Sequence, residues 1–96
     1  MIKHIVLFKL KDATSAAINE AVAVLLSMKG KTPQILDIEV GADFLRSERS
    51  YDVALQVTVA NREALDAYQL DAYHCSTVKP YMHEKRLSSV AVDYEI

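Results

Sequence analysis

Four segments of the chain alternate between apolar and polar positions with the period of two that is typical of β-strands. They are expected at residues 2–10, 34–40, 51–59 and 87–96. In the first segment Ile2, His4 and Phe8 share one face, but the opposite face is also apolar in its middle. This predicts a central strand covered on both sides. The second segment has a charged face, with Asp37 and Glu39, and is expected at an edge of the sheet.

Two further stretches have apolar residues at the helical spacings of three and four. The first is expected to begin at a capping residue, Asp12 or Thr14, and to stop at Gly30. Asn61 is expected to cap the second, over residues 62–69. A shorter helical piece is expected around Pro80.

The resulting order, β-α-β-β-α-β, is typical of the α+β ferredoxin-like fold, an antiparallel sheet with its helices on one face. One domain over residues 1–96 accounts for all of these elements. Assigning the more apolar set of each strand to the helix side leaves a surface of small and mixed residues facing outward: Ile5, Leu7, Ala54, Gln56, Thr58, Ser89 and Ala91. Two such surfaces could stack into a barrel, so a homodimer is predicted.

Composition and charge narrow the function classes. The formal net charge is −2, without a basic stripe, which argues against a nucleic-acid partner. The single cysteine, Cys75, cannot form an internal disulfide, and no segment has the ~20 apolar residues that span a bilayer. The start of the chain does not resemble a signal peptide. We therefore expect a cytoplasmic protein without a membrane partner.

Candidate chemistry lies in a few histidines and tyrosines. In this fold the first and third strands are expected to run parallel and adjacent, so that His4 lies close to Tyr51 or Val53. The second helix then returns His74 to the same end of the sheet, with Tyr68 on its apolar side, so that His4, Tyr68 and His74 are expected to converge. Tyr94, late in the fourth strand, is a further candidate for this cluster. Histidine exchanges protons near neutral pH, and a tyrosine hydroxyl can orient it or polarise a carbonyl.

That pairing suits aldol or enolisation chemistry on a small molecule. The histidines lack metal-motif spacing and no Gly-rich phosphate loop occurs, so neither metal nor cofactor is expected. The same residues also have a purely structural interpretation. His4 could be a core histidine bonded to the backbone, Tyr68 a packing residue, and Cys75 a small filler. The loop with Arg46, Glu48 and Arg49 is expected to be solvated.

Five segments in order, IKHIVLFKLKD, EVGADF, SYDVALQVTV, EALDAYQLDAYH and VAVDYEI, resemble the stress-responsive dimeric α/β-barrel (Dabb) family. The resemblance implies a ferredoxin-like fold and a dimeric barrel. One plant member, olivetolic acid cyclase, closes a polyketide by a cofactor-free aldol reaction, and its catalytic tyrosine and histidine match Tyr68 and His74. His4 also matches a histidine of that enzyme, but a further pocket histidine falls on Val53, and the family's HPxH stretch reads DAYH here.

Three hypotheses follow. The first is a small-molecule pocket between the sheet and the second helix, with possible cyclase or lyase chemistry by His74, Tyr68 and His4. The second is a non-catalytic stress or assembly protein that acts through its homodimer. The third, a cofactor-free oxygenase or isomerase, is an analogy with other dimeric barrels of this fold. The presence or absence of an open cavity beneath the second helix separates the first from the second.

Overall fold

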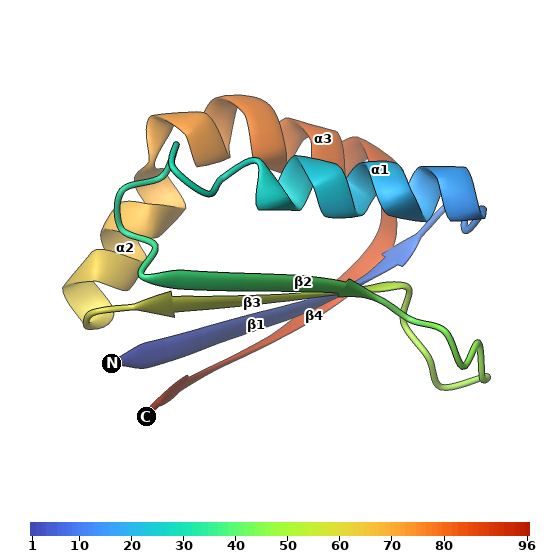
Figure 1. Ribbon diagram of the computed structural model, residues 1–96, viewed down its shortest axis with the longest axis horizontal. Helices are drawn as coiled ribbons and strands as arrows, with labels where there is room; N and C mark the ends of the chain where they lie inside the picture. The colour runs from blue at the N-terminus through green and yellow to red at the C-terminus, as the bar shows by residue number, and fades with distance from the viewer.

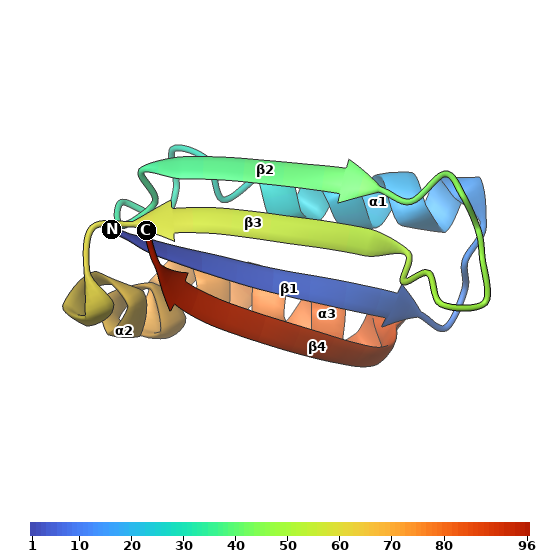
Figure 2. The same cartoon turned by 90° about the horizontal axis from the view of Figure 1, so that it is seen from below.

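The computed structural model describes all residues of the chain, 1–96. The elements run in the following order: β1 (Ile2–Leu10), α1 (Ser15–Leu26), β2 (Asp37–Ala42), β3 (Val53–Val59), α2 (Arg62–Leu70), a π-helical turn η1 (His74–Val78), α3 (Lys79–Lys85) and β4 (Arg86–Glu95). Figure 1 shows that the helices cover one face of the sheet, and Figure 2 shows the other face uncovered. The predicted ferredoxin-like α+β fold is confirmed.

The strand order in the sheet is β2-β3-β1-β4, so β1 is central and β2 lies at an edge, as predicted. All neighbouring strands are antiparallel, which makes the prediction of a parallel first and third strand wrong. The chain crosses over through α1 to β2, which runs in the direction of β1, and then reverses into β3. His4 is consequently paired with Val57, and Tyr51 and Val53 lie toward the other end of the sheet.

The helix starts follow the predicted caps. The Thr14 hydroxyl accepts a hydrogen bond from the Ala17 N–H at 3.3 Å, and Asn61 Oδ1 accepts one from the Ala64 N–H at 2.8 Å. Helix α1 ends at Leu26, earlier than the predicted stop at Gly30, and the turn that follows contains Gly30 at φ +80°, a conformation that favours glycine. Pro80 lies in the first turn of α3, where its missing N–H is tolerated.

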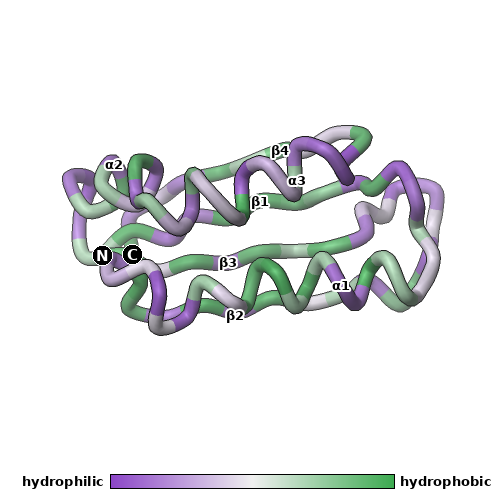
Figure 3. Tube along the Cα trace, turned by 90° about the horizontal axis from the view of Figure 1, so that it is seen from above, coloured by the Kyte–Doolittle hydropathy of each residue, from purple (hydrophilic) through white to green (hydrophobic).

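The hydrophobic core lies between the sheet and the helices. Strands β1 and β3, mostly hydrophobic along the trace in Figure 3, contribute one layer, and α1, α2, η1 and α3 the other. Three of its largest fully buried side chains are Leu25, Met28 and Tyr68. The core thus reaches from α1 to α2, so any hollow near Tyr68 is bordered by core side chains.

The two faces of β4 are the reverse of the prediction. Ser89, Ala91 and Asp93 are paired with Phe8, Val6 and His4, so they face the helices. The apolar set, Val90, Val92 and Tyr94, faces outward with exposed fractions of 47%, 54% and 45%. Alternation defines two faces but does not say which one meets the helices, and here the outer face is the more apolar. The predicted outward positions of Ser89 and Ala91 are therefore wrong.

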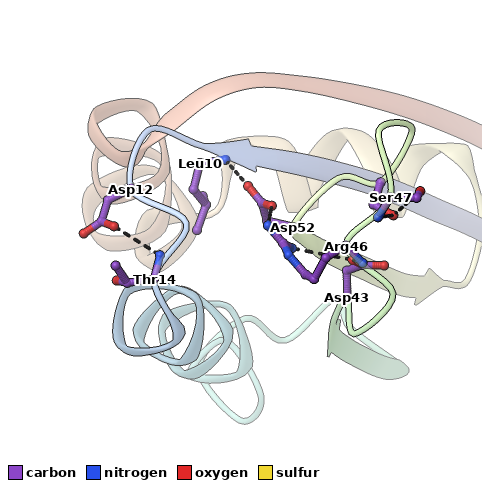
Figure 4. A network of polar contacts seen from close by, with 8 residues as sticks. Leu10, Asp12, Thr14, Asp43, Arg46, Ser47 and Asp52 are labelled. Carbon is purple, nitrogen blue, oxygen red and sulfur yellow. Dashed lines mark hydrogen bonds and ion pairs between the residues drawn. The ribbon is translucent and has the colours of Figure 1, made fainter.

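The loop between β2 and β3 is held by a buried carboxylate (Figure 4). Asp52 is 2% exposed; one oxygen accepts the Leu10 N–H at 2.7 Å and the other accepts Arg46 Nη2 at 2.7 Å. Burial alone would raise the pKa of Asp52, but these two hydrogen bonds and the Arg46 charge outweigh it and lower the pKa. Arg46, Glu48 and Arg49 are exposed, as expected of a solvated loop, but Arg46 also holds the loop through its ion pair with the buried Asp52.

Candidate functional site

A cavity of about 240 Å³ opens beneath the second half of the helical layer. Its apolar walls come from strands β1, β3 and β4 and from the helices above them. The polar groups that line it are His4, Tyr68, Gln69, His74, Lys79, His83, Arg86 and Ser89. The open cavity beneath α2 that the pocket hypothesis requires is therefore present.

The His4 imidazole is held by a carboxylate from the edge strand. His4 is 7% exposed, and its Nδ1 is hydrogen-bonded to Oδ1 of Asp93, the residue directly opposite on β4. A carboxylate on Nδ1 fixes the proton on that nitrogen and leaves Nε2 as the acceptor. The structural interpretation of His4, a backbone-bonded core histidine, does not describe this arrangement.

Tyr68 contacts both imidazoles through its ring. The ring is stacked on His74 with centroids 4.6 Å apart, and it meets His4 edge-on with centroids 5.6 Å apart. The hydroxyl instead donates to Met28 Sδ at 3.7 Å within the core. Burial, together with the Asp71 carboxylate, raises the pKa of Tyr68. The hydroxyl is therefore not hydrogen-bonded to either histidine, and of the two roles considered for it, orienting a histidine or polarising a carbonyl, the structure does not show the first.

His74 is fixed by the turn that precedes it. The Asp71 carboxylate accepts the His74 backbone N–H at 3.1 Å and the Thr32 hydroxyl at 3.0 Å. His74 opens the π-helical turn η1, a conformation that is frequent at functional sites. Its Nδ1 is buried without a hydrogen-bond partner. Burial, and after it the Lys79 charge, lowers the pKa of His74, so the imidazole is neutral at pH 7.

This shift predicts a pH-dependent stability. Because the pKa of His74 is lower in the folded state, the unfolded state binds more protons in acid. The contribution of His74 to stability is therefore fully present above the reference pKa of about 6.5 and decreases as the pH drops below it. We expect the urea midpoint to decrease from pH 7.5 to pH 5, and His74→Gln to reduce that decrease. His83→Gln, a change at an exposed histidine, serves as the control. If the urea midpoint of His74→Gln falls with pH as steeply as that of the natural protein, the pH dependence does not come from His74.

The structure brings His4, Tyr68 and His74 together but not Tyr94, which faces outward from β4. Its neighbour Asp93 lies beside His4 instead, and this could not be expected from a sequence interpretation in which the apolar set of β4 faces the helices. Cys75 is exposed rather than a filler. No group of three or more His, Cys, Asp or Glu side chains is placed to hold a metal ion. No helix combines the length and apolarity needed to cross a bilayer.

A model of the stress-responsive A/B barrel domain family matches residues 2–96. The chain belongs to this family. No curated protein matches the chain. A dimeric protein of unknown function from Bacteroides fragilis, with a ferredoxin-like fold, is 28% identical to this A/B barrel domain, with a TM-score of 0.83 over 99% of this chain and 95% of that chain.

Two more distant structures share the fold. A dimeric ferredoxin-like protein of unknown function from Thermobifida fusca is 23% identical, with a TM-score of 0.84 over 99% of this chain and 90% of that chain. Hydroxynitrile lyase from Passiflora edulis is 15% identical, with a TM-score of 0.82 over 99% of this chain and 92% of that chain. At these identities the likeness shows the fold alone.

Proposed function

We propose that residues 1–96 form one A/B barrel domain whose cavity binds a small organic molecule and transfers protons on it without a cofactor. The observation that carries this proposal is that two imidazoles, His4 and His74, line one cavity and contact the same tyrosine ring. The reaction class is enolisation or aldol-type bond formation or cleavage, as in a cyclase or lyase. The free Cys75 fits the reducing cytoplasm, where we place the protein.

The two histidines have different environments and hence different roles. His4, with Nδ1 bonded to Asp93, has Nε2 free to remove a proton from a carbon beside a carbonyl. The Asp93 carboxylate then stabilises the imidazolium that forms, as in other carboxylate–histidine pairs. The neutral His74 carries one ring N–H, and this N–H donates a hydrogen bond to the carbonyl oxygen as negative charge develops there. The proton on His4 returns to the product in the last step.

Tyr68 is a positioning residue in this scheme. Its ring fixes the planes of both imidazoles, while its hydroxyl is engaged with Met28. The similarity of Tyr68 and His74 to the catalytic pair of olivetolic acid cyclase supports the location of the site. The hydroxynitrile lyase from Passiflora edulis, an enzyme with this fold, supports only the idea that such a domain can be catalytic.

The test is a two-dimensional NMR binding screen with polyketide-like, quinone and aromatic acid ligands. We expect chemical-shift changes that cluster at His4, Tyr68 and His74, and at least a tenfold weaker affinity in His74→Ala. Tyr68→Phe should bind within about twofold of the natural protein, because it keeps the stacked ring. Ligands that leave the cavity resonances unmoved, in a protein that is still folded, would argue against the site.

A homodimer is the second part of the proposal. The outer face of the sheet carries exposed apolar side chains on β4, and the structures from Bacteroides fragilis and Thermobifida fusca are both dimeric. We propose that this face stacks against its copy to close the barrel. The alternative function, a non-catalytic stress or assembly protein, rests on the same surface. An empty ligand screen together with a stable dimer would favour that alternative.

A further inference from the structure

The mouth of the cavity carries three basic side chains from one side of α3 and its end. Lys79 and His83, four residues apart, share one face of α3; Arg86 opens β4 directly after that helix, and all three line the cavity. His4 and His74 add two more basic groups deeper inside. No aspartate or glutamate lines the cavity. The Asp93 carboxylate is bonded to His4 but does not itself line the cavity, and no carboxylate balances Lys79 and Arg86 at the mouth.

The cations at the mouth have no acidic partners elsewhere. Lys79 Nζ contacts the Gln69 carbonyl oxygen at 3.4 Å, and Arg86 Nη1 contacts the Ser89 hydroxyl at 3.2 Å. By contrast, Arg46 is paired with Asp43 and Asp52, and Arg62 with Glu95. Both Lys79 and Arg86 are only partly exposed. A partly buried positive charge bound only to neutral acceptors favours an anion from outside the chain.

A second hollow in the protein lacks this excess of basic side chains. The depression of about 420 Å³ between the end of β1, α1 and α3 is larger, but it has both signs of charge. Lys11 and Lys85 are balanced there by Asp12, Glu20 and Glu84. It contains no histidine. A ligand that selects the histidine-lined cavity by charge would thus be an anion.

We infer that the ligand of the proposed site is a small organic anion, with its reacting carbonyl at the histidines, an apolar body against the interior walls and an oxyanion group at the mouth bound by Arg86 and Lys79. This inference rests on the proposed function. The interior walls include Val6, Phe8, Leu55 and Met82, which suit an apolar body. The cavity, at about 240 Å³, is below the ~300 to 1,000 Å³ of drug-sized sites, so a single ring with a short chain fits. The planar guanidinium of Arg86 suits a carboxylate or a phosphate.

The experiment compares anionic and neutral probes of nearly equal shape. Benzoate, phenylacetate and 2,4-dihydroxybenzoate are each titrated beside their primary amides, with phenyl phosphate as an additional probe, and affinities are read from NMR shifts of the cavity residues. We expect the acids to bind at least tenfold more tightly than the amides, because a charge-assisted hydrogen bond is replaced by a neutral one. Arg86→Gln and Lys79→Gln should reduce that ratio toward one without weakening the amides.

Matched controls remove the same charges away from the cavity. Lys85→Gln changes a lysine that lies over the Tyr81 ring, and Arg49→Gln changes an exposed loop arginine, so both should keep the full preference for acids. Equal binding of acids and amides overturns this inference but leaves the proposed site in place. If none of the probes shifts the resonances of the cavity residues, both this inference and the proposed site are overturned. Tighter binding of phenyl phosphate than of the acids supports the inference and identifies a phosphate as the oxyanion.

Discussion

Asp52→Ala is expected to lower the free energy of unfolding by about 3 kcal/mol, the combined cost of a buried N–H without an acceptor and an arginine without its partner. The Leu10 N–H and Arg46 Nη2 both lose their acceptor in this variant. Arg46 also has a left-handed backbone, at φ 56°, which its contacts with Asp43 and Asp52 hold in place. The Arg46 side chain is 43% exposed, so its ion pair contributes the smaller share.

Urea unfolding at fixed protein concentration measures this effect. Asp52→Asn keeps an oxygen for the Leu10 N–H and should lose about half as much. Glu48→Ala, an exposed change in the same loop, should stay within about 0.5 kcal/mol. A loss in Asp52→Ala no larger than in Glu48→Ala would show that the carboxylate does not hold the loop.

The same variant tests the direction of the Asp52 shift. The pKa of Asp52 is lower in the folded state than its ordinary value of 3.8, so its contribution is present above that value and is lost as the pH falls through the folded pKa. The difference in stability between the natural protein and Asp52→Ala should therefore be larger at pH 7 than at pH 3. A difference that grows in acid would contradict the shift.

The fold could be predicted because the signals that specify its elements lie within short segments of the sequence. Period-two strands, capped helices and Gly30 specify the element order, and that order is compatible with few topologies. Asp52 could not be recognised as buried, because a carboxylate at the start of a strand gives the same pattern whether it faces water or accepts a backbone N–H from β1. Its partner Leu10 is 42 residues away, and sequence spacing does not reveal that contact.

The site was predictable in part. His4, Tyr68 and His74 were chosen for their chemistry and their apolar surroundings, and the structure places their rings in contact. Asp93 could not be identified, because alternate residues of β4 form two sets, and the apolar set, rather than the set that contains Asp93, was expected to face the core. In this fold the outer face of the sheet is itself a candidate for burial by a second sheet, so apolarity does not identify the helix side. The roles of the residues stay a proposal.

Val92→Glu is expected to split the proposed homodimer. Val92 lies opposite Ile5, which in turn lies opposite Gln56, so its side chain is near the middle of the outer face. In a face-to-face dimer a glutamate there would be buried without a partner, which costs several kcal/mol. The dissociation constant should rise at least ~100-fold, about 2.7 kcal/mol. Sedimentation velocity over a range of micromolar concentrations would show the shift from dimer to monomer.

The control for this variant is Val92→Thr, which keeps the β-branched shape without a charge and should remain dimeric at the same concentrations. Because Val92 points away from the helices, Val92→Glu should also leave the resonances of His4 and His74 in place. A variant that is monomeric and still binds the organic anions would show that each cavity works alone. If Val92→Glu sediments as a dimer like the natural protein, the chains associate through another surface, and the stacked sheet is not the interface.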